Sequence, residues 1–249
     1  MYKNKIKHID IEETHIRLIS DILYPNLEEY IKKIRFDLKK YIYEDPEFLS
    51  SLEPLNKRVN ASEIVRIMDK SSKIGNVGPM ACVAGTISQM CLNQLIMKGS
   101  KLSSIENGGD IAIINNKKLV CGIYSNTIKN IGFKLKPRSK PLGICTSSSK
   151  IGHSISFGNS ESVTIIGPEA SICDGLATRI ANDVNGESDE ESMMNGLESA
   201  EKYKEYFDGG LITVGGLVGT IGKIPEIVTT EDFDIDYENT IIILLTVII

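Results

Sequence analysis

Histidine and paired cysteine motifs are scarce in this sequence. Its 249 residues include three histidines, which argues against a histidine-rich metal centre. The five cysteines, an odd number, are Cys82, Cys91, Cys121, Cys145 and Cys173, and none forms a Cys-x-x-Cys pair. We expect reduced, buried thiols in a cytosolic protein. One alternative stays open: an enzyme of cofactor or sulfur metabolism that uses Cys145 or Cys173, although neither has a histidine nearby in sequence to activate it.

The sequence has no excess of basic residues, with 28 Lys and Arg against 33 Asp and Glu, and no apolar run at residues 1–5. The formal net charge is −5 and the pI about 5.4, so we expect no nucleic-acid partner. Residues 1–5 run into alternating polar residues, and we therefore expect a cytoplasmic protein. The apolar run 240–249 has about half the length that spans a bilayer, so no membrane partner is expected. Its Ile and Val content predicts a strand buried in a sheet or in an interface. Since the interface could lie between two copies of the chain, a homodimer is one possibility.

Several nucleotide and hydrolase motifs are absent. The glycine-rich stretch 215–223 ends in Gly-Lys, but Leu217 stands where a phosphate-binding loop needs glycine and Ile224 where it needs Ser or Thr. The spacing Gly-x-Gly-x-x-Gly is missing, as are Gly-x-Ser-x-Gly and His-Glu-x-x-His. The glycines of 215–222 are better explained as tight turns or bulges between strands.

Hydrophobic periodicity predicts a mixed α+β protein. Helical spacing occurs at 26–43, 61–70, 79–98, 169–182 and 187–207. A hairpin is expected at 5–23, and strands at 103–106, 110–114, 119–124, 131–136, 143–147, 153–157, 163–166, 211–214, 217–221 and 226–228. The pair Asn115-Asn116 signals a hairpin turn between two of these strands. Because no βαβ alternation is visible, we expect antiparallel sheets with helices packed on one face, in one large domain over 1–249 or in two fused halves.

Two polar motifs stand out against this background. Asp174 and Thr178 lie four residues apart on an expected helix and share one face. Their carboxylate and hydroxyl are hard oxygen ligands, of the kind that hold Mg²⁺ together with water and substrate phosphates. Upstream, Gly108 and Gly109 leave the backbone free of side chains, so that a flat or phosphorylated ligand can lie against it. Asp110 then opens the next strand. Simpler structural roles stay open for all three residues. The Asp174 carboxylate can stabilise the N-terminal part of its helix through the helix dipole, and the Thr178 hydroxyl can hydrogen-bond to the backbone of the same helix. Asp110 can form a turn at the end of a strand.

Four short motifs follow one another between residues 107 and 178. They are Asn107-Gly108-Gly109-Asp110-Ile111, Gly143-Ile144-Cys145-Thr146-Ser147-Ser148, Ser162-Val163-Thr164-Ile165 and Asp174-Gly175-Leu176-Ala177-Thr178. In this order they resemble the ApbE-like (FAD:protein FMN transferase) superfamily. The N-terminal helices and shortened motifs resemble one branch of it, the uncharacterised protein family UPF 0280.

The resemblance implies a T-fold-like, ApbE-like α+β architecture and a site for a small phosphorylated ligand. It implies FAD or FMN, or another nucleotide, as the ligand, with Mg²⁺ on Asp174 and Thr178. The residues implied to bind the cofactor are Asn107, Gly108, Gly109, Asp110, Thr146, Ser147 and His153. The activity implied is a Mg²⁺-dependent flavin transfer, in which FMN moves to a protein hydroxyl.

This sequence departs from the transferase pattern in two places. The transferases carry an Ala-Lys-Gly segment where residues 83–85 read Val-Ala-Gly. They also carry a His followed by Asp-Pro-x-Thr-Gly, of which only His153 remains in 152–161. We therefore expect the fold and the pocket to carry over better than the activity, and no catalytic residue is assigned. A binding or scaffold protein without catalysis is the alternative function.

Overall fold

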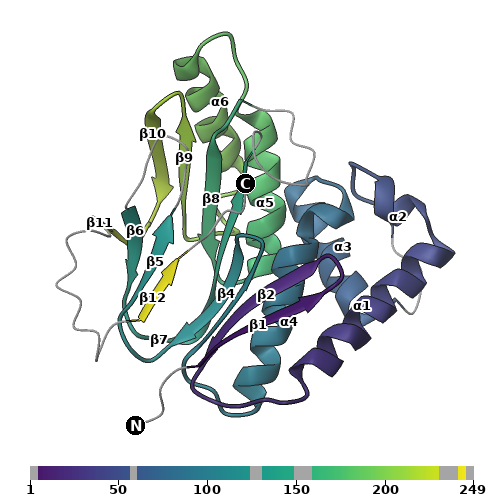
Figure 1. Cartoon of the computed structure of the whole chain (residues 1–249). Coiled ribbons are helices and arrows are strands. Elements are labelled where there is room, and N and C mark those ends of the chain that lie inside the picture. The colour runs from purple at the N-terminus through teal and green to yellow at the C-terminus, as the bar shows by residue number, and fades with distance from the viewer. Residues whose placement is uncertain (1–4, 57–60, 124–130, 149–158, 230–240, 245–249) are drawn as a thin grey trace.

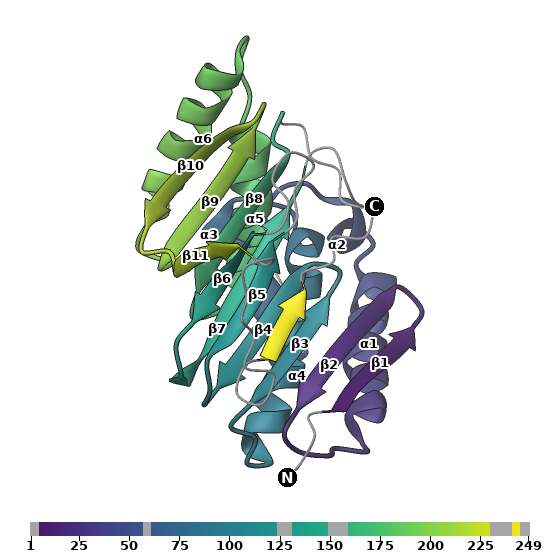
Figure 2. The same ribbon diagram turned by 60° about the vertical axis from the view of Figure 1, so that its left-hand side comes forward.

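The computed structural model describes residues 5–56, 61–123, 131–148, 159–229 and 241–244. Helices, an eight-stranded sheet and a four-stranded sheet form three successive layers (Figure 1). The large sheet lies in the middle, and turning the molecule shows the small sheet on the face opposite the helices (Figure 2). This confirms the α+β class with helices on one face of an antiparallel sheet.

Every neighbouring pair in the large sheet is antiparallel. Its strands, in spatial order, are β1 (Lys5–Ile11), β2 (Thr14–Ser20), β3 (Ser103–Asn107), β4 (Asp110–Asn115), β7 (Arg138–Ser147), β8 (Ser162–Gly167), β9 (Gly209–Val214) and β10 (Leu217–Gly222). The N-terminal hairpin β1–β2 therefore continues the sheet through β3, although more than eighty residues separate them in sequence.

The small sheet has the order β11 (Glu226–Thr229), β6 (Ile131–Leu135), β5 (Leu119–Ile123) and β12 (Ile241–Leu244). β12 runs parallel to β5, an exception to the antiparallel expectation. The hairpin predicted at Asn115-Asn116 is wrong, because β4 and β5 belong to different sheets. The buried Asn115 amide donates to the carbonyls of Lys117 (2.7 Å) and Lys136 (3.0 Å), which stabilises the crossing from one sheet to the other.

The helices are α1 (Leu27–Glu44), α2 (Glu47–Ser50), α3 (Glu63–Gly75), the 3₁₀ turn η1 (Pro79–Cys82), α4 (Val83–Met97), α5 (Ala170–Asp183) and α6 (Asp189–Lys202). α5 packs on β7 and β8, and α4 packs on β3, β4 and α5. The helix predicted over 187–207 is shorter than expected, while α2 was not predicted. The strand predicted at 153–157 lies outside the described residues.

By length and composition alone, the segment Pro79–Met97 could cross a membrane, and 50% of its apolar window is buried inside the protein. Its contacts with the sheet and α5 are those of a core helix.

Two hydrophobic cores explain why the central strands are buried on both faces. Along β4, Ala112 and Ile114 point into the core shared with the helices, whereas Ile111 and Ile113 point into the core between the sheets. This alternation follows from the two-residue period of a strand. Because both faces are covered, β3, β4, β8 and β9 carry long apolar or small-residue runs instead of the polar–apolar alternation of a half-exposed strand.

Candidate functional site

The turn between β3 and β4 has a conformation that only glycine adopts easily. Gly108 has φ +62° and Gly109 has φ +101°, while Asn107 pairs with Asp110 across the hairpin. Side chains are strained at such angles. A Cβ built on Gly108 would meet no described atom within 4 Å. Among the described residues, nothing covers the turn backbone at Gly108, as a close ligand contact requires.

The neighbouring strand and helix hold this turn in place. The Asn107 side chain accepts from the His15 N–H at 3.3 Å and donates to the Ala84 carbonyl at 3.4 Å. The Ser88 hydroxyl donates to the Asp110 carbonyl at 2.9 Å. Asn107 thus has structural contacts of its own, and its expected contact with a cofactor remains a prediction.

Asp110 is a buried carboxylate at the start of β4. It is 8% exposed, and among the described residues its Oδ1 has no hydrogen-bond partner. Burial raises the pKa of Asp110 to about 7, although the Cys145 thiol and the Thr146 backbone N–H favour its charged form. A buried carboxylate oxygen without a partner is costly, so this atom is suited to a ligand or a cation.

Asp174 supplies a second buried carboxylate from α5. It is also 8% exposed, and its Oδ2 accepts a 2.8 Å hydrogen bond from the Gly85 backbone N–H. Burial raises the pKa of Asp174 well above its usual range, and the charge of Asp110 raises it further. The structure therefore brings Asp110 and Asp174 close enough to repel each other, although 64 positions separate them in sequence.

Glycines and small hydroxyl side chains let α5 approach its neighbours. A Cβ on Gly85 would lie 2.5 Å from the Ala170 carbonyl oxygen and 2.7 Å from the Asp174 Cβ. On the same helix, the Ser171 hydroxyl forms hydrogen bonds with the Ser71 hydroxyl (2.7 Å) and the Thr86 hydroxyl (2.6 Å). Sequence reasoning did not identify this network. The small residues at these positions were its only signal.

The remaining predicted site residues divide into three groups. Thr178 is buried on α5, one turn beyond Asp174. On β7, the Thr146 hydroxyl bonds that of Thr164 at 2.9 Å, and the buried Ser147 hydroxyl has no partner among the described residues. His153 lies outside the described residues. Ser147 and Asp110 thus each have a buried polar atom that makes no hydrogen bond with the described residues.

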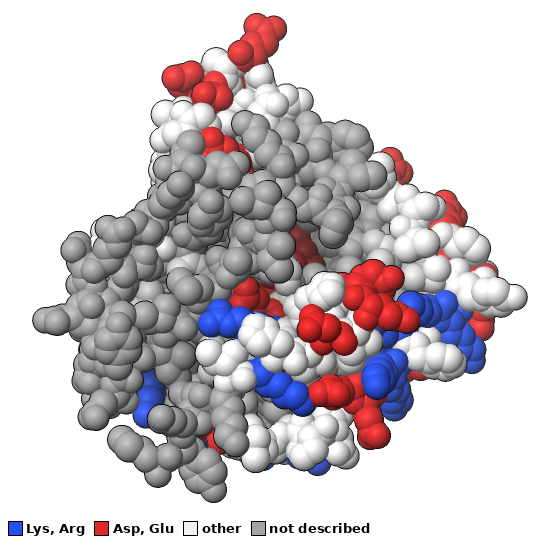
Figure 3. All heavy atoms as spheres, in the orientation of Figure 1, with Lys and Arg blue, Asp and Glu red and all other residues white. Residues whose placement is uncertain are grey.

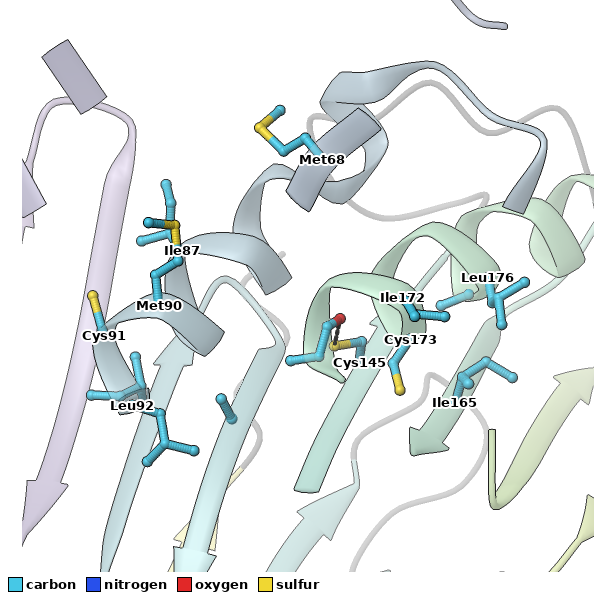
Figure 4. Packing of buried hydrophobic residues seen from close by; sticks show 14 of the residues in the cluster. Met68, Ile87, Met90, Cys91, Leu92, Cys145, Ile165, Ile172, Cys173 and Leu176 are labelled. Atoms are coloured by element: carbon cyan, nitrogen blue, oxygen red, sulfur yellow. Dashed lines mark hydrogen bonds between the residues drawn. The ribbon is translucent and has the colours of Figure 1, made fainter. Parts of the chain in front are cut away.

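The two cysteines considered as nucleophiles are built into the core. Cys145 points from β7 toward α5, where its Sγ donates to the Ala170 carbonyl at 3.1 Å (Figure 4). Cys173 lies among the core residues of α5, and both side chains are fully buried. Burial raises the pKa of each thiol well above its ordinary value. Since the thiolate is the nucleophile, the structure does not favour a thiol mechanism.

The donors present at this site suit Mg²⁺ better than a transition metal. Among the described residues, no three His, Cys, Asp or Glu side chains are grouped to hold a metal. What the site offers is carboxylate and hydroxyl oxygen from Asp110, Asp174 and Thr178. Mg²⁺ is commonly held by one or two carboxylates, with water and phosphate oxygens completing its shell. A metal here would depend on its ligand for part of that shell.

Comparison with known proteins places the chain in a family. The family model described as "AbpE bacteria" matches residues 6–205. A UPF0280 protein of Methanobrevibacter smithii is 54% identical over 235 residues, covering 93% of this chain and 99% of the relative. A UPF0280 protein of Methanothermobacter thermautotrophicus is 46% identical over 232 residues, covering 91% and 89%. The chain belongs to the UPF0280 family.

Solved structures show that this UPF0280 protein has an ApbE-like fold. The flavin transferase ApbE from Vibrio cholerae aligns with a TM-score of 0.56 at 12% identity, covering 93% of this chain and 100% of that one. The flavinyl transferase ApbE of Pseudomonas stutzeri aligns with a TM-score of 0.54 at 13% identity, covering 89% and 95%. These similarities confirm the resemblance of UPF0280 to ApbE proteins and the expected fold.

Proposed function

We propose that this UPF0280 protein binds a flavin nucleotide, or another ligand with a diphosphate group, beside the β3–β4 turn. Mg²⁺ would be held by Asp174 and Thr178. The turn backbone at Gly108 and Gly109 would lie against the ligand, and Asp110 would orient it. The ligand class is supported by the motif order and by the ApbE-like fold, whose solved examples are named flavin transferases.

The observation that carries this proposal is the pair of buried carboxylates. Burial raises the pKa of both Asp110 and Asp174, the charge of Asp110 raises that of Asp174 further, and one oxygen of Asp110 lacks a described partner. Mg²⁺, when bound, would supply the positive charge that stabilises both carboxylates and neutralises a diphosphate. The Gly85 N–H already fixes one oxygen of Asp174, which leaves the other available to the metal.

Transfer of FMN from FAD to a protein hydroxyl is the finer activity that this site could support. It would break the bond between the two phosphates of FAD, join FMN to the hydroxyl oxygen and release AMP. The chain lacks the lysine and the Asp-Pro-x-Thr-Gly segment of the transferases. We therefore propose ligand binding as the primary function, and transfer as the activity to be tested second.

Calorimetric titration of FAD, FMN, ATP and ADP, with and without Mg²⁺, tests the binding. We expect Mg²⁺-dependent binding that weakens at least about tenfold in Asp174→Asn, a variant that keeps an oxygen to accept from Gly85. Glu198→Gln, at an exposed carboxylate of α6, is the control and should bind as the wild type does. Absence of binding by all four ligands would contradict the proposal. A ligand affinity that is the same with and without Mg²⁺, and the same in Asp174→Asn as in the wild type, would contradict the metal site.

Mass spectrometry of protein incubated with FAD and Mg²⁺ tests the transfer. A peptide carrying FMN on Ser or Thr supports the transferase activity. Tight binding of FAD without such a peptide supports the binding or scaffold role instead.

A further inference from the structure

A cavity of about 400 Å³ lies at the start of β7, at the opposite end of this strand from the candidate site. We call it the β6–β7 cavity, because residues 134–138, which run from the end of β6 through the link to the first residue of β7, form one wall. A second wall is formed by the link between β10 and β11, residues 223–225, together with Glu226 at the start of β11 and Asp208. Its volume lies within the range of sites for small molecules.

The floor of the β6–β7 cavity is the open end of the core between the two sheets. Leu142 and Ile166 are each 2% exposed and belong to that core, against which Ile224 packs. Along β7, the pairing with β4 shifts register between Ile113 and Asn115. The start of β7 therefore departs from regular pairing next to the cavity. This floor offers an apolar surface to the body of a ligand.

The rim carries an excess of positive charge. Four basic and two acidic side chains line the cavity. Lys134 and Glu226 form an ion pair with each other at 3.0 Å. The three basic residues that remain, Lys136, Arg138 and Lys223, form no ion pair with a carboxylate among the described residues, and the Arg138 Nε donates to the Lys140 carbonyl at 3.0 Å. Among the described lining residues Asp208 is the one acid outside that ion pair, so the rim they form is cationic although the chain as a whole has a net charge of −5.

Close backbone contacts fix the wall formed by residues 223–226. The Lys223 N–H donates to the Asp208 carbonyl at 2.7 Å. Gly222 has φ +66°, and a Cβ built on Gly209 would lie 2.5 Å from the Lys223 carbonyl oxygen. Since the backbone of this wall is held by strand ends on both sides, the cavity is formed before any ligand arrives, which lowers the ordering cost of binding.

The β6–β7 cavity is distinct from the site at Asp110 and Asp174. β7 reaches from Arg138 at the cavity to Ser147 at that site, and its ten residues span roughly 30 Å at the rise of a strand. None of the cavity's lining residues belongs to the β3–β4 turn or to α5.

We propose that the β6–β7 cavity binds a small organic anion, with an apolar body against Leu142, Ile166 and Ile224 and a carboxylate, sulfonate or phosphate group against Arg138 and Lys223. The apolar floor alone would accept a neutral molecule. The cationic rim selects the anion, because a charge-assisted contact is stronger than a neutral one.

Two fluorescent probes of similar shape test this proposal. Anilinonaphthalene sulfonate carries the anion, and N-phenyl-naphthylamine has the same kind of apolar body without charge. We expect the sulfonate to bind the wild type saturably and more tightly than the neutral probe, and to weaken as salt rises from about 0.05 M to about 0.5 M. FAD should not displace it. Equal affinity of the two probes, no saturable binding, or displacement by FAD would overturn the proposal.

Variants locate the binding. Arg138→Gln with Lys223→Gln should weaken the sulfonate at least about fivefold and change the neutral probe less than about twofold. Lys32→Gln with Lys33→Gln removes the same charge from the exposed face of α1 and should leave both probes unchanged. Ile224→Trp, which fills the cavity from its partly exposed wall, should weaken both probes. The assignment would be overturned if the two double variants lost sulfonate affinity equally, or if Ile224→Trp bound both probes as the wild type does. Thermal melting checks that each variant is folded.

Discussion

The backbone N–H of Gly85 donates a 2.8 Å hydrogen bond to Asp174 Oδ2 and thereby joins α4 to α5 at the candidate site. This contact exists because residue 85 has no side chain, so the two helices meet backbone to side chain. It orients the carboxylate and favours its charged form. The geometry of the site is thus set partly by the glycine of the Val-Ala-Gly segment at residues 83–85, which was not among the predicted site residues.

Gly85→Ala should therefore disturb both stability and the site. Its Cβ would lie 2.5 Å from the Ala170 carbonyl oxygen, so α4 and α5 must separate. We expect a loss of about 1–3 kcal/mol in the free energy of unfolding, measured by urea denaturation, together with weaker Mg²⁺-dependent ligand binding. Asn93→Ala, on the exposed face of α4, should stay within about 0.5 kcal/mol of the wild type. Equal effects of the two changes would contradict this account of the helix contact.

The pH dependence of stability should show the cost of the buried Asp110. Because burial raises its pKa from 3.8 to about 7, the folded protein keeps a proton there that the unfolded chain has released. Without Mg²⁺, this contribution to stability is fully present below about pH 4 and is lost as the pH rises through about 7.

Asp110→Asn should remove the part of that slope that Asp110 contributes, because the amide does not ionise, while Asp174, whose pKa is also raised, keeps its own part. At about pH 8 without Mg²⁺, the variant should be more stable than the wild type by one to a few kcal/mol, on the order given by linkage. Added Mg²⁺ should stabilise the wild type more than Asp110→Asn, because the variant keeps the proposed metal ligands Asp174 and Thr178 but lacks one of the two buried carboxylates. Urea denaturation across the pH range measures this, and Glu190→Gln, at an exposed carboxylate, is the control. A wild-type stability that rises from pH 4 to pH 7 would be inconsistent with the buried carboxylates.

The cysteines should be unreactive in the folded protein. All five are buried and free, and burial raises the pKa of Cys145 and Cys173. Alkylation by iodoacetamide at neutral pH, followed by peptide mass spectrometry, should label them only after denaturation. Rapid labelling of Cys145 or Cys173 in the native protein would revive the thiol-enzyme alternative.

The glycine turn should tolerate asparagine but not a branched side chain. Gly108 has φ +62°, a left-handed conformation that Asn adopts more easily than other residues with side chains. We expect Gly108→Asn to keep nearly all stability and Gly108→Val to lose about 1–2 kcal/mol. Ligand binding by Gly108→Asn then reports whether the open space beside the turn is used: a folded variant with weakened FAD binding supports it. Unaltered binding would show that the ligand lies elsewhere.

The charged surface was only partly foreseeable. Over α1 and the β1–β2 hairpin, basic and acidic side chains alternate (Figure 3), with ion pairs such as Lys7–Glu28 at 2.6 Å. The buried Arg35 contacts Thr14, Glu12 and Glu13 from α1 and thereby holds the hairpin turn. The sequence predicted the amphipathic helix, but not that one of its cations would turn inward.

The positions of most elements could be predicted from the sequence, because helix and strand periodicity depend on residues a few positions apart. The helix expected at 169–182 is α5 at Ala170–Asp183, and the strand at 163–166 lies within β8. The turn at Asn115-Asn116 was misread because a local turn signal does not say which strands will pair. Which strands pair depends on which of their faces pack against other apolar surfaces in the folded protein. Here the chain leaves β4 and enters the second sheet at β5.

The sequence by itself determined the α+β class, the glycine turn at Gly108 and Gly109, and the family resemblance carried by its motifs. Only the tertiary structure decided that Asp110 and Asp174 are buried close together and that the Gly85 N–H bonds Asp174. It also decided that a cavity with a cationic rim lies at the start of β7. Turns and periodicity are local properties of the chain. Burial and mutual repulsion of charges arise only when segments far apart in sequence pack together and exclude water, so they cannot be deduced from any one segment.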